Sequence, residues 1–561
     1  MENTVPAPCS AHDLGSVRAV TVQDVLGRVG LPAPVGELAA RRWDVVVVGG
    51  GHNGLTAAAY LARAGRSVLV LEAREQLGGA ATLERPFPDD PDYLVSPCAY
   101  VVGLLHPLVV SELGLAGRGF AVTLMDPSLW CPFPDGTSVA LWSDAAATTA
   151  AIAALSPSDV EGYLAYEALF ERIRVRLRLG ARDTWLGAAP DRAELAELFA
   201  DDPGALDVLL HRSISDVVEE HVRDERLRSL LHGQGVIGTW AGPRDSGTAG
   251  VHAMHAMGTL NDGRWGYVRG GTGRVSFAIA DAAVAHGAVL ASGVAVAAIE
   301  PAQGVRLAGG ELIAADVVVS SADPKRTTAL CGAAVPDEWR SRVAAWRSTS
   351  PVVKINCALR RLPVFPAAAD PDLPHRAMVT ITSGLDATQA AFERAVAGHP
   401  APSWAEVYFP SRYDPSVAPD GRHVMSVFAQ YVPYALADGD WDGRREEIAD
   451  AALAEVARFA PDVADCIEHR QVLGPPDVEA RIGLTGGRIF QGDCLPDQMW
   501  DRRFAPRTPV PGLYLAGAAT HPGGSVIGAN GRNAAMAVLA DTPDFSAPSP
   551  RAPRSSGRPP S

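Results

Sequence analysis

Three glycines at a fixed spacing are the residues of this sequence most clearly suited to one kind of chemistry. Gly49, Gly51 and Gly54 fit the pattern G-x-G-x-x-G, between the apolar run 43–48 and an Ala-rich stretch that stops at Gly65. In a strand–turn–helix unit, the first glycine allows a tight turn, the second lets backbone approach a pyrophosphate, and the third lets the helix pack on the strand. The helix N-terminus adds free N–H groups and a positive dipole end. The spacing therefore predicts a dinucleotide site.

An acid at the end of the next apolar run supports this prediction. Glu72 closes the run 67–72, about 20 residues beyond the glycines, where a carboxylate binds ribose hydroxyls. The same carboxylate would repel the 2′-phosphate of NADP. Runs 43–48 and 67–72, with the helix between them, are expected to form one βαβ unit whose strands are buried on both faces.

A second pair of glycines follows Glu72 directly. The segment 74–79 reads Arg-Glu-Gln-Leu-Gly-Gly, which resembles the R-x-x-x-G-G extension of FAD enzymes of the amine oxidase and phytoene desaturase type. The resemblance implies that FAD is the cofactor and that a second loop closes over its diphosphate and ribityl chain. It implies cofactor contacts at Arg74, Gly78, Gly79 and Ala80.

A third candidate element lies far along the chain. The run 512–517 and the Gly-rich loop 518–525 resemble the strand and loop that reach the ribityl chain and the isoalloxazine in such enzymes. The resemblance implies further cofactor contacts at Val296, Gly517, Thr520, Ile527 and Gly528. Ala518 stands where many flavoproteins have an acid, which leaves open which group binds the ribityl hydroxyls. Val296 is equally compatible with an ordinary strand residue.

Together these segments resemble the phytoene desaturase-related flavoproteins, and among them the branch named pyridine nucleotide-disulfide oxidoreductase domain-containing protein two. The likeness covers most of residues 43–540, mainly in the stretches 48–80, 233–271 and 490–535. It implies a substrate domain inserted into an FAD domain, with a lid over the isoalloxazine. It also implies C–C desaturation, or a related dehydrogenation or isomerisation, of a lipophilic substrate. The seven scattered cysteines contain no CxxC pair, so a dithiol centre is not expected.

The expected fold class is α/β, with a Rossmann-like FAD-binding domain and an inserted α+β substrate domain. We assign residues 43–135, 264–335 and 475–540 to the FAD-binding domain, 136–263 and 336–474 to the substrate domain, 1–42 to an N-terminal extension and 541–561 to a disordered Pro-rich tail. Carotenoid desaturases begin at the first strand, so the extension departs from them.

Three further segments give local predictions. Residues 21–29 are expected to form an amphipathic helix that the prolines after it break. Ser158 to Glu161 has the form of a capping box that opens a helix. Residues 171–179 alternate charged and apolar side chains, which favours a solvated helix with snorkelling arginines over a membrane-surface patch.

Three side chains are candidates for proton transfer beside the flavin. Their positions in the resembling family suggest His255, Tyr267 and His521. His255 lies among apolar residues and is either a hydrogen-bonded core histidine or a general base. His521 precedes a proline in a Gly-rich loop, and is more typical of a residue that shapes the loop. Residues 266–273 could be a second backbone approach to FAD or a simple turn.

Composition narrows the other possibilities. The net charge of −15 argues against nucleic-acid binding, which needs a basic surface. No Cys/His cluster has metal-ligand spacing, and no apolar stretch reaches the ~20 residues of a membrane span. We therefore expect no metal site and a cytoplasmic protein, with peripheral membrane contact as a further option.

The leading functional hypothesis is an FAD-dependent desaturase or dehydrogenase that acts on a lipophilic or secondary-metabolite substrate. A flavin amine oxidase is the alternative, although the sequence shows no clear pattern of lysine and aromatic cage. A binding protein that keeps the fold without catalysis is a third hypothesis, against which the complete glycine set and Glu72 argue. Oxygen or a quinone would accept the electrons, and the oligomeric state stays open.

Overall fold

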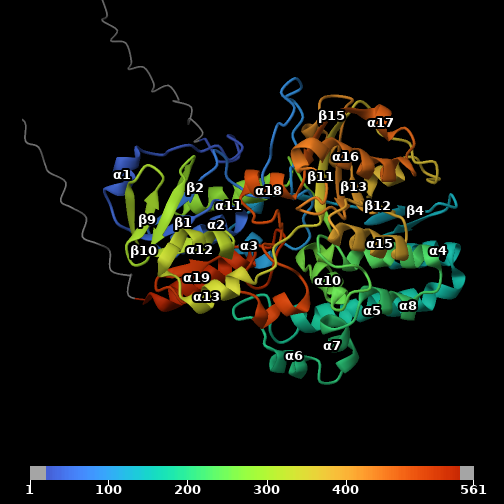
Figure 1. The fold of residues 1–561 in the computed structure, drawn as a ribbon, viewed down its shortest axis with the longest axis horizontal. Coiled ribbons are helices and arrows are strands. Elements are labelled where there is room, and N and C mark those ends of the chain that lie inside the picture. The colour runs from blue at the N-terminus through green and yellow to red at the C-terminus, as the bar shows by residue number, and fades with distance from the viewer. Residues whose placement is uncertain (1–19, 544–561) are drawn as a thin grey trace, which may run out of the picture.

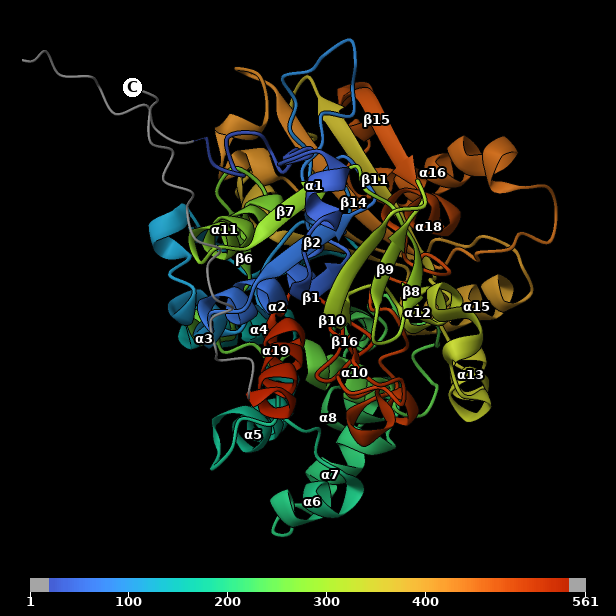
Figure 2. The same cartoon turned by 90° about the vertical axis from the view of Figure 1, so that its left-hand side faces the viewer.

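Strands that lie far apart in the sequence form the first of two large sheets. The structure, a computed structural model, describes residues 20–543. The sheet has the order β7-β2-β1-β10-β9-β8, and β16 also pairs with β10, as Figure 2 shows. Its strands are β1 (Trp43–Val48), β2 (Val68–Glu72), β7 (Val289–Ser292), β8 (Val296–Glu300), β9 (Gly304–Leu307), β10 (Leu312–Ser320) and β16 (Leu513–Leu515). Because β7, β2, β1, β10 and β16 run parallel, the expected α/β class is confirmed.

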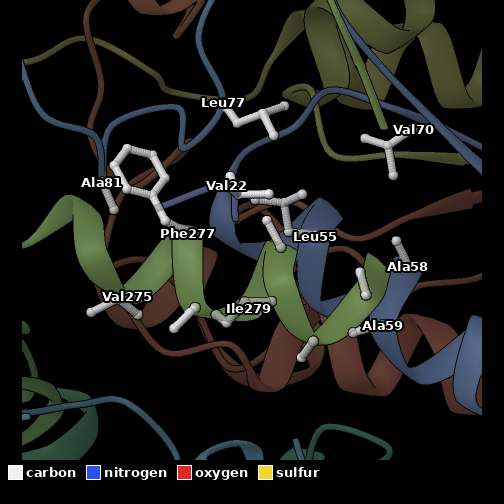
Figure 3. Packing of buried hydrophobic residues seen from close by; sticks show 14 of the residues in the cluster. Val22, Leu55, Ala58, Ala59, Val70, Leu77, Ala81, Val275, Phe277 and Ile279 are labelled. Atoms are coloured by element: carbon white, nitrogen blue, oxygen red, sulfur yellow. The ribbon is translucent and has the colours of Figure 1, made fainter. Parts of the chain in front are cut away.

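Both faces of this parallel core are covered, which explains the four consecutive valines of β1. Val45 and Val47 pack in a cluster with α2 (His52–Arg63), α11 (Gly273–Ala285) and α19 (Ala529–Asp541). Figure 3 shows Leu55 of α2 and Phe277 of α11 in this cluster. Val46 and Val48 point to the opposite face, toward α1 (Val35–Ala39) and α12 (Pro324–Cys331).

The second sheet lies opposite the first, on the right of Figure 1. Its order is β15-β11-β14-β13-β12-β4-β5, and all pairs except β12–β4 are antiparallel. The strands are β4 (Leu129–Pro132), β5 (Ser138–Leu141), β11 (Val352–Leu359), β12 (Met378–Thr382), β13 (Trp404–Tyr408), β14 (His423–Gln430) and β15 (Ile467–Leu473). Val353 and Ile355 of β11 pack against α16 (Trp441–Ala457), so Lys354 and Asn356 face the other side of the sheet.

The boundary expected at residue 135 falls within this second sheet. β4 lies in the range assigned to the FAD-binding domain, yet it pairs with β5 and β12. A separate two-stranded sheet joins β3 (Val122–Leu124) to β6 (Gly266–Val268). The strand β4 has only four residues, and its partner β12 lies far later in the chain, so no local pattern marks this pairing.

Helices form a third part of the molecule, below the second sheet in Figure 1. They are α4 (Ala145–Leu155), α5 (Val160–Arg174), α6 (Arg192–Leu198), α7 (Pro203–Leu210), α8 (Ile214–His221), α9 (Glu225–Leu231) and α10 (Thr248–His255). The remaining helices are α3 (Pro107–Glu112), α13 (Asp337–Ala344), α14 (Leu373–Arg376), α15 (Leu385–Val396), α17 (Val463–Cys466) and α18 (Pro475–Ile482). Within residues 20–543, none of the helices has the length and apolar character needed to cross a bilayer.

Two local predictions in the helical part are wrong. No capping box forms at Ser158, because the Asp159 carboxylate instead accepts hydrogen bonds from the backbone N–H groups of Arg223 and Asp224. The arginines of 171–179 do not snorkel into solvent as a group. Arg176 pairs with Asp201 at 2.6 Å, and Arg178 is buried against Asp183 at 2.7 Å. These ion pairs explain the charge alternation without a membrane surface.

The N-terminal segment is ordered from Val20 but is not the predicted helix. Residues 21–27 form turns, because Leu26 (φ 49°) and Gly27 (φ 81°) adopt left-handed backbone. A Cβ at Gly27 would lie 2.5 Å from the Phe277 ring, so only glycine fits there. The segment packs on α11, and Val22 is part of that core. The predicted disordered tail falls almost entirely outside the described residues.

Candidate active site

A cavity of about 830 Å³ separates the carboxyl edge of the first sheet from one face of the second. Residues that follow the ends of β1, β2, β10 and β16 line one end, at positions 49–53, 73, 321–322 and 517–518. Ligands of open α/β sheets bind at this edge, outside the carboxyl ends of the strands. Residues of β11, β13 and β14 line the other end, together with α9 and α10.

The first glycine loop has the geometry that the spacing predicts. Gly49 (φ 96°) turns the chain after β1, and α2 begins at His52. A Cβ at Gly54 would lie 2.2 Å from the Gly49 carbonyl oxygen, so glycine is required for this close packing. At Gly51 a Cβ would meet nothing nearer than the Gly79 Cα at 3.9 Å, which leaves this backbone open to the cavity.

The Glu72 carboxylate lies against the same loop. Its Oε2 accepts a hydrogen bond from the Gly50 N–H at 2.7 Å, and its Oε1 accepts one from the Arg74 N–H at 2.9 Å. The side chain is buried but lines the cavity. Each carboxylate oxygen keeps a second lone pair, and this arrangement suits the two hydroxyls of a ribose.

The second glycine loop closes directly over the first. The Gly78 N–H donates to the Gly50 carbonyl at 2.8 Å, and a Cβ at Gly79 would lie 3.2 Å from the Gly51 Cα. Gly78 and Gly79 both have positive φ, at 110° and 58°. Two loops without side chains thus meet at the cavity wall, where backbone N–H groups can reach a diphosphate.

The predicted cofactor contacts divide into two groups. Those that line the cavity are Gly49, Gly51, Glu72, Gly79, Ala80, Val296 and Gly517. Those that lie behind its wall are Gly54, Arg74, Gly78, Thr520, Ile527 and Gly528. The second group shapes the wall: Arg74, for example, donates to the Gly79 carbonyl at 3.3 Å and pairs with Glu84 at 3.3 Å.

The residues present fit FAD. Two polar atoms at the start of α2, His52 Nε2 and Asn53 Oδ1, are buried beside the cavity without a hydrogen-bond partner among the described residues. Burial lowers the pKa of His52 to about 4, so its ring is neutral at pH 7. Beside Ala518, the Gln491 side chain also lines the cavity, and its Oε1 accepts from the Ala519 N–H at 3.1 Å. These groups stand where a flavin dinucleotide offers phosphates, hydroxyls and ring nitrogens.

A buried lysine faces the cavity from β11. Lys354 is one of only two lysines in the chain, and 3% of its surface is exposed. Its Nζ donates to Asn356 Oδ1 at 2.6 Å and to Ser426 Oγ, and it lies 4.7 Å from the centre of the Tyr100 ring. Burial lowers the pKa of this ammonium to about 7. A large fraction of Lys354 is therefore a neutral amine at physiological pH.

A buried carboxyl lies on the same face, two strands away. Glu406 of β13 and Lys354 of β11 both pair in register with Phe428 of β14, so the three side chains form one row that faces the cavity. Glu406 Oε2 accepts hydrogen bonds from the hydroxyls of Tyr408 at 2.8 Å and Tyr100 at 3.3 Å. Burial raises the pKa of the Glu406 carboxyl to about 7, against the lowering effect of the two hydroxyls.

The three proton-transfer candidates take different positions. His255 lines the cavity; its Nδ1 contacts the Val251 carbonyl at 2.9 Å, which leaves Nε2 as an acceptor, and burial lowers its pKa. Tyr267 and His521 do not line this cavity. His521 Nε2 instead contacts the Thr184 carbonyl at 2.6 Å, and burial lowers its pKa to about 4. In residues 20–543, no three His, Cys, Asp or Glu side chains meet in a metal-binding group.

The sequence analysis missed the polar row of the second sheet. The signal was present, because Lys354 and Glu406 each interrupt an otherwise apolar run of strand residues. A charged residue inside such a run reads as an error in the strand pattern until the opposite face of the sheet is known to line a cavity. Lys354 with Tyr100, Tyr408 and Phe428 also supplies the lysine and aromatic rings that the sequence pattern did not show.

Comparison with known proteins then decides the family. A family model described as flavin containing amine oxidoreductase matches residues 54–539. The chain belongs to this family. Its cofactor is FAD, and it is an FAD-dependent oxidoreductase.

The relatives of the chain extend the same assignment. The pyridine nucleotide-disulfide oxidoreductase domain-containing protein 2 of Rattus norvegicus is 35% identical and covers 89% of this chain and 94% of its own. A limonene dehydrogenase polypeptide of Castellaniella defragrans is 27% identical over 89% and 95% of the two chains. The lycopene-forming phytoene desaturase of a Paracoccus species is 25% identical over 88% and 96%. An oxidoreductase from Methanosarcina mazei shares the fold, with a TM-score of 0.56 at 16% identity over 88% and 99%.

Proposed function

We propose that the chain removes two hydrogens from a C–H-bearing, mainly apolar substrate and leaves a double bond. Bound FAD supplies the chemistry that accepts the hydride, at its N5 atom. The observation that carries the proposal is the cavity itself, which joins the dinucleotide edge to a chamber walled by apolar side chains such as Leu231, Ile237, Trp265 and Met378. A chamber of this kind binds an apolar molecule and keeps water from the reacting atoms.

Lys354 is the residue that we assign to the second hydrogen, which leaves as a proton. The neutral amine uses both of its N–H groups, toward Asn356 Oδ1 and Ser426 Oγ. Its lone pair is then free to take a proton at Nζ. A base with a pKa near the working pH combines a large deprotonated fraction with useful basicity, and the pKa of about 7 meets this condition.

Amine oxidation is the second candidate function. It is favoured by the aromatic rings around the acid, because Tyr100 lies 4.7 Å from Tyr408 and 6.1 Å from Phe428 between ring centres. Aromatic faces and a carboxylate together suit an ammonium group. The dehydrogenase proposal has more support, because the relatives above that are named for a reaction are a dehydrogenase and a desaturase.

Anaerobic bleaching of the flavin separates the two. Purified holoprotein would be mixed, without oxygen, with monocyclic and acyclic terpenes and, separately, with primary alkylamines. We expect a terpene to bleach the visible flavin band and to yield a product two hydrogens lighter by mass spectrometry. Bleaching by amines alone would replace the proposal with amine oxidation. Loss of bleaching in Lys354→Met, with flavin retained, would support the assignment of Lys354.

A further inference from the structure

The Glu406 carboxyl has one oxygen that the fold does not use. Both tyrosine hydroxyls converge on Oε2, and Oε1 receives no hydrogen bond from the described residues. Glu406 is 4% exposed, and it lines the cavity. A buried carboxyl oxygen without a partner is costly unless a ligand supplies one.

The position of Glu406 in the sheet separates it from the flavin edge. Lys354 stands on β11, beside the edge strand β15, whereas Glu406 stands two strands further along the row, a Cα separation of about 10 Å at the usual strand spacing. In Figure 1 the order β11, β13, β12, β4 leads away from the first sheet. Glu406 therefore lies at the far end of the chamber from the dinucleotide loops.

The surroundings of Glu406 are apolar. Met378 lies two residues before Thr380, the in-register neighbour of Glu406 on β12, and so shares its face of the sheet. Met378, Leu129 and Met125 line the cavity around this end. A single polar group at the end of an apolar chamber is suited to one polar group at the end of an apolar molecule.

We propose that Glu406, supported by Tyr408 and Tyr100, binds a hydroxyl group at one end of an otherwise apolar substrate and so fixes which C–H bond lies over the flavin. This rests on the proposed dehydrogenase function. A hydroxyl fits better than an ammonium, because a second cation would share the chamber with Lys354 whenever that amine is protonated. A hydroxyl can also donate to the carboxylate or accept from the carboxylic acid, and so keeps its hydrogen bond in both states of a group whose pKa burial raises to about 7.

Titration of the holoprotein with three simple probes tests this site. 1-Octanol, octylamine and octane share one apolar chain, and binding is read from the change in the visible flavin spectrum. We expect 1-octanol to bind about 10-fold or more tightly than octane, as a hydrogen bond to a charged group allows. The preference should fall below about 3-fold in Glu406→Leu. Thr380→Val is the matched control: it changes the neighbouring buried side chain, which has no hydrogen-bond partner in the structure, and should leave the preference intact.

Three results would overturn the inference: an undiminished preference in Glu406→Leu, tighter binding of octylamine than of 1-octanol, or no spectral change with any probe. If Glu406→Leu does not fold, Glu406→Met serves as a more flexible apolar replacement with the same expected loss. The inference fails alone if terpenes still bleach the flavin while 1-octanol shows no preference over octane. The proposed function fails alone if the octanol preference depends on Glu406 but no terpene bleaches the flavin.

Discussion

Replacing Lys354 with methionine tests whether this buried amine loses its proton near neutral pH. Burial lowers its pKa from 10.5 to about 7, and the side chain is only 3% exposed. Between these two pKa values the unfolded chain holds the proton and the folded chain does not. Because the unfolded state then binds more protons, the free energy of unfolding rises with pH in this window.

The magnitude follows from the size of the window. Each pKa unit corresponds to about 1.36 kcal/mol, so the step from pH 7 to pH 9 should add about 2.7 kcal/mol of stability through Lys354 alone. Lys354→Met has no such proton. Methionine has a similar length and no charge, although it leaves Asn356 Oδ1 and Ser426 Oγ without the amine as a donor.

Denaturant unfolding of both holoproteins at pH 7 and pH 9, followed by tryptophan fluorescence, measures this difference. The native protein should gain about 2.7 kcal/mol more than Lys354→Met between the two pH values. Other titrating groups are common to both proteins and cancel in the comparison. Equal gains in the two proteins would refute the reasoning, since they would mean that Lys354 stays protonated in the fold. In the same variant, anaerobic flavin reduction should slow by roughly 10²–10⁴-fold, as expected for loss of a general base.

Four further predictions concern the cofactor site and its surroundings. Gly54→Ala places a Cβ 2.2 Å from the Gly49 carbonyl oxygen and should yield protein without bound FAD; a native flavin-to-protein ratio would contradict this. Glu72→Ala removes the acceptor of two backbone N–H groups beside the cavity and should raise the Kd for FAD about 10-fold or more, measured by flavin fluorescence. Gln76→Ala breaks the bonds of this side chain to the Leu26 and Leu83 carbonyls, at 2.6 and 2.7 Å, and should speed FAD release, whereas exposed Glu75→Ala should not; equal rates would exclude a role for the N-terminal segment. His255→Ala should abolish turnover and retain flavin if Nε2 takes part in the reaction, and unchanged turnover would remove His255 from the mechanism.

The dinucleotide half of the site could be predicted from sequence because its determinants are local. Four valines in a row require a strand buried on both faces, and the glycines after them are the only residues that fit the turn and the close helix packing. The acid two elements later then falls at the neighbouring carboxyl edge. Each of these features depends on contacts within one βαβ unit, so the pattern and the geometry coincide.

The substrate half could not be predicted in the same way because its determinants are non-local. Lys354 and Glu406 become neighbours in one row only through pairing with Phe428, and the sequence does not indicate which of the two faces of each strand lines a cavity. The pairing of β4 with β12 is equally invisible to local pattern. The helix expected at 21–29 failed for a different reason: its apolar spacing is real, since Val22, Leu26 and Val29 pack on the core, but Gly27 turns the chain between them.

This N-terminal segment also connects a part of the chain with no counterpart in carotenoid desaturases to the cofactor loops. The Leu77 N–H donates to the Gly27 carbonyl at 3.0 Å, one residue before Gly78 pairs with the first glycine loop. The Gly30 N–H and carbonyl both bond Ser292 at 2.9 Å, the last residue of β7, which pairs with β2 at Glu72. The segment therefore holds both the loop that covers the diphosphate and the strand next to the ribose-binding acid. Because these bonds involve mainly backbone atoms, the contact depends on the conformation at Gly27 and Gly30 rather than on particular side chains, and it follows that a bulkier residue at Gly27 would weaken FAD binding without touching the cavity.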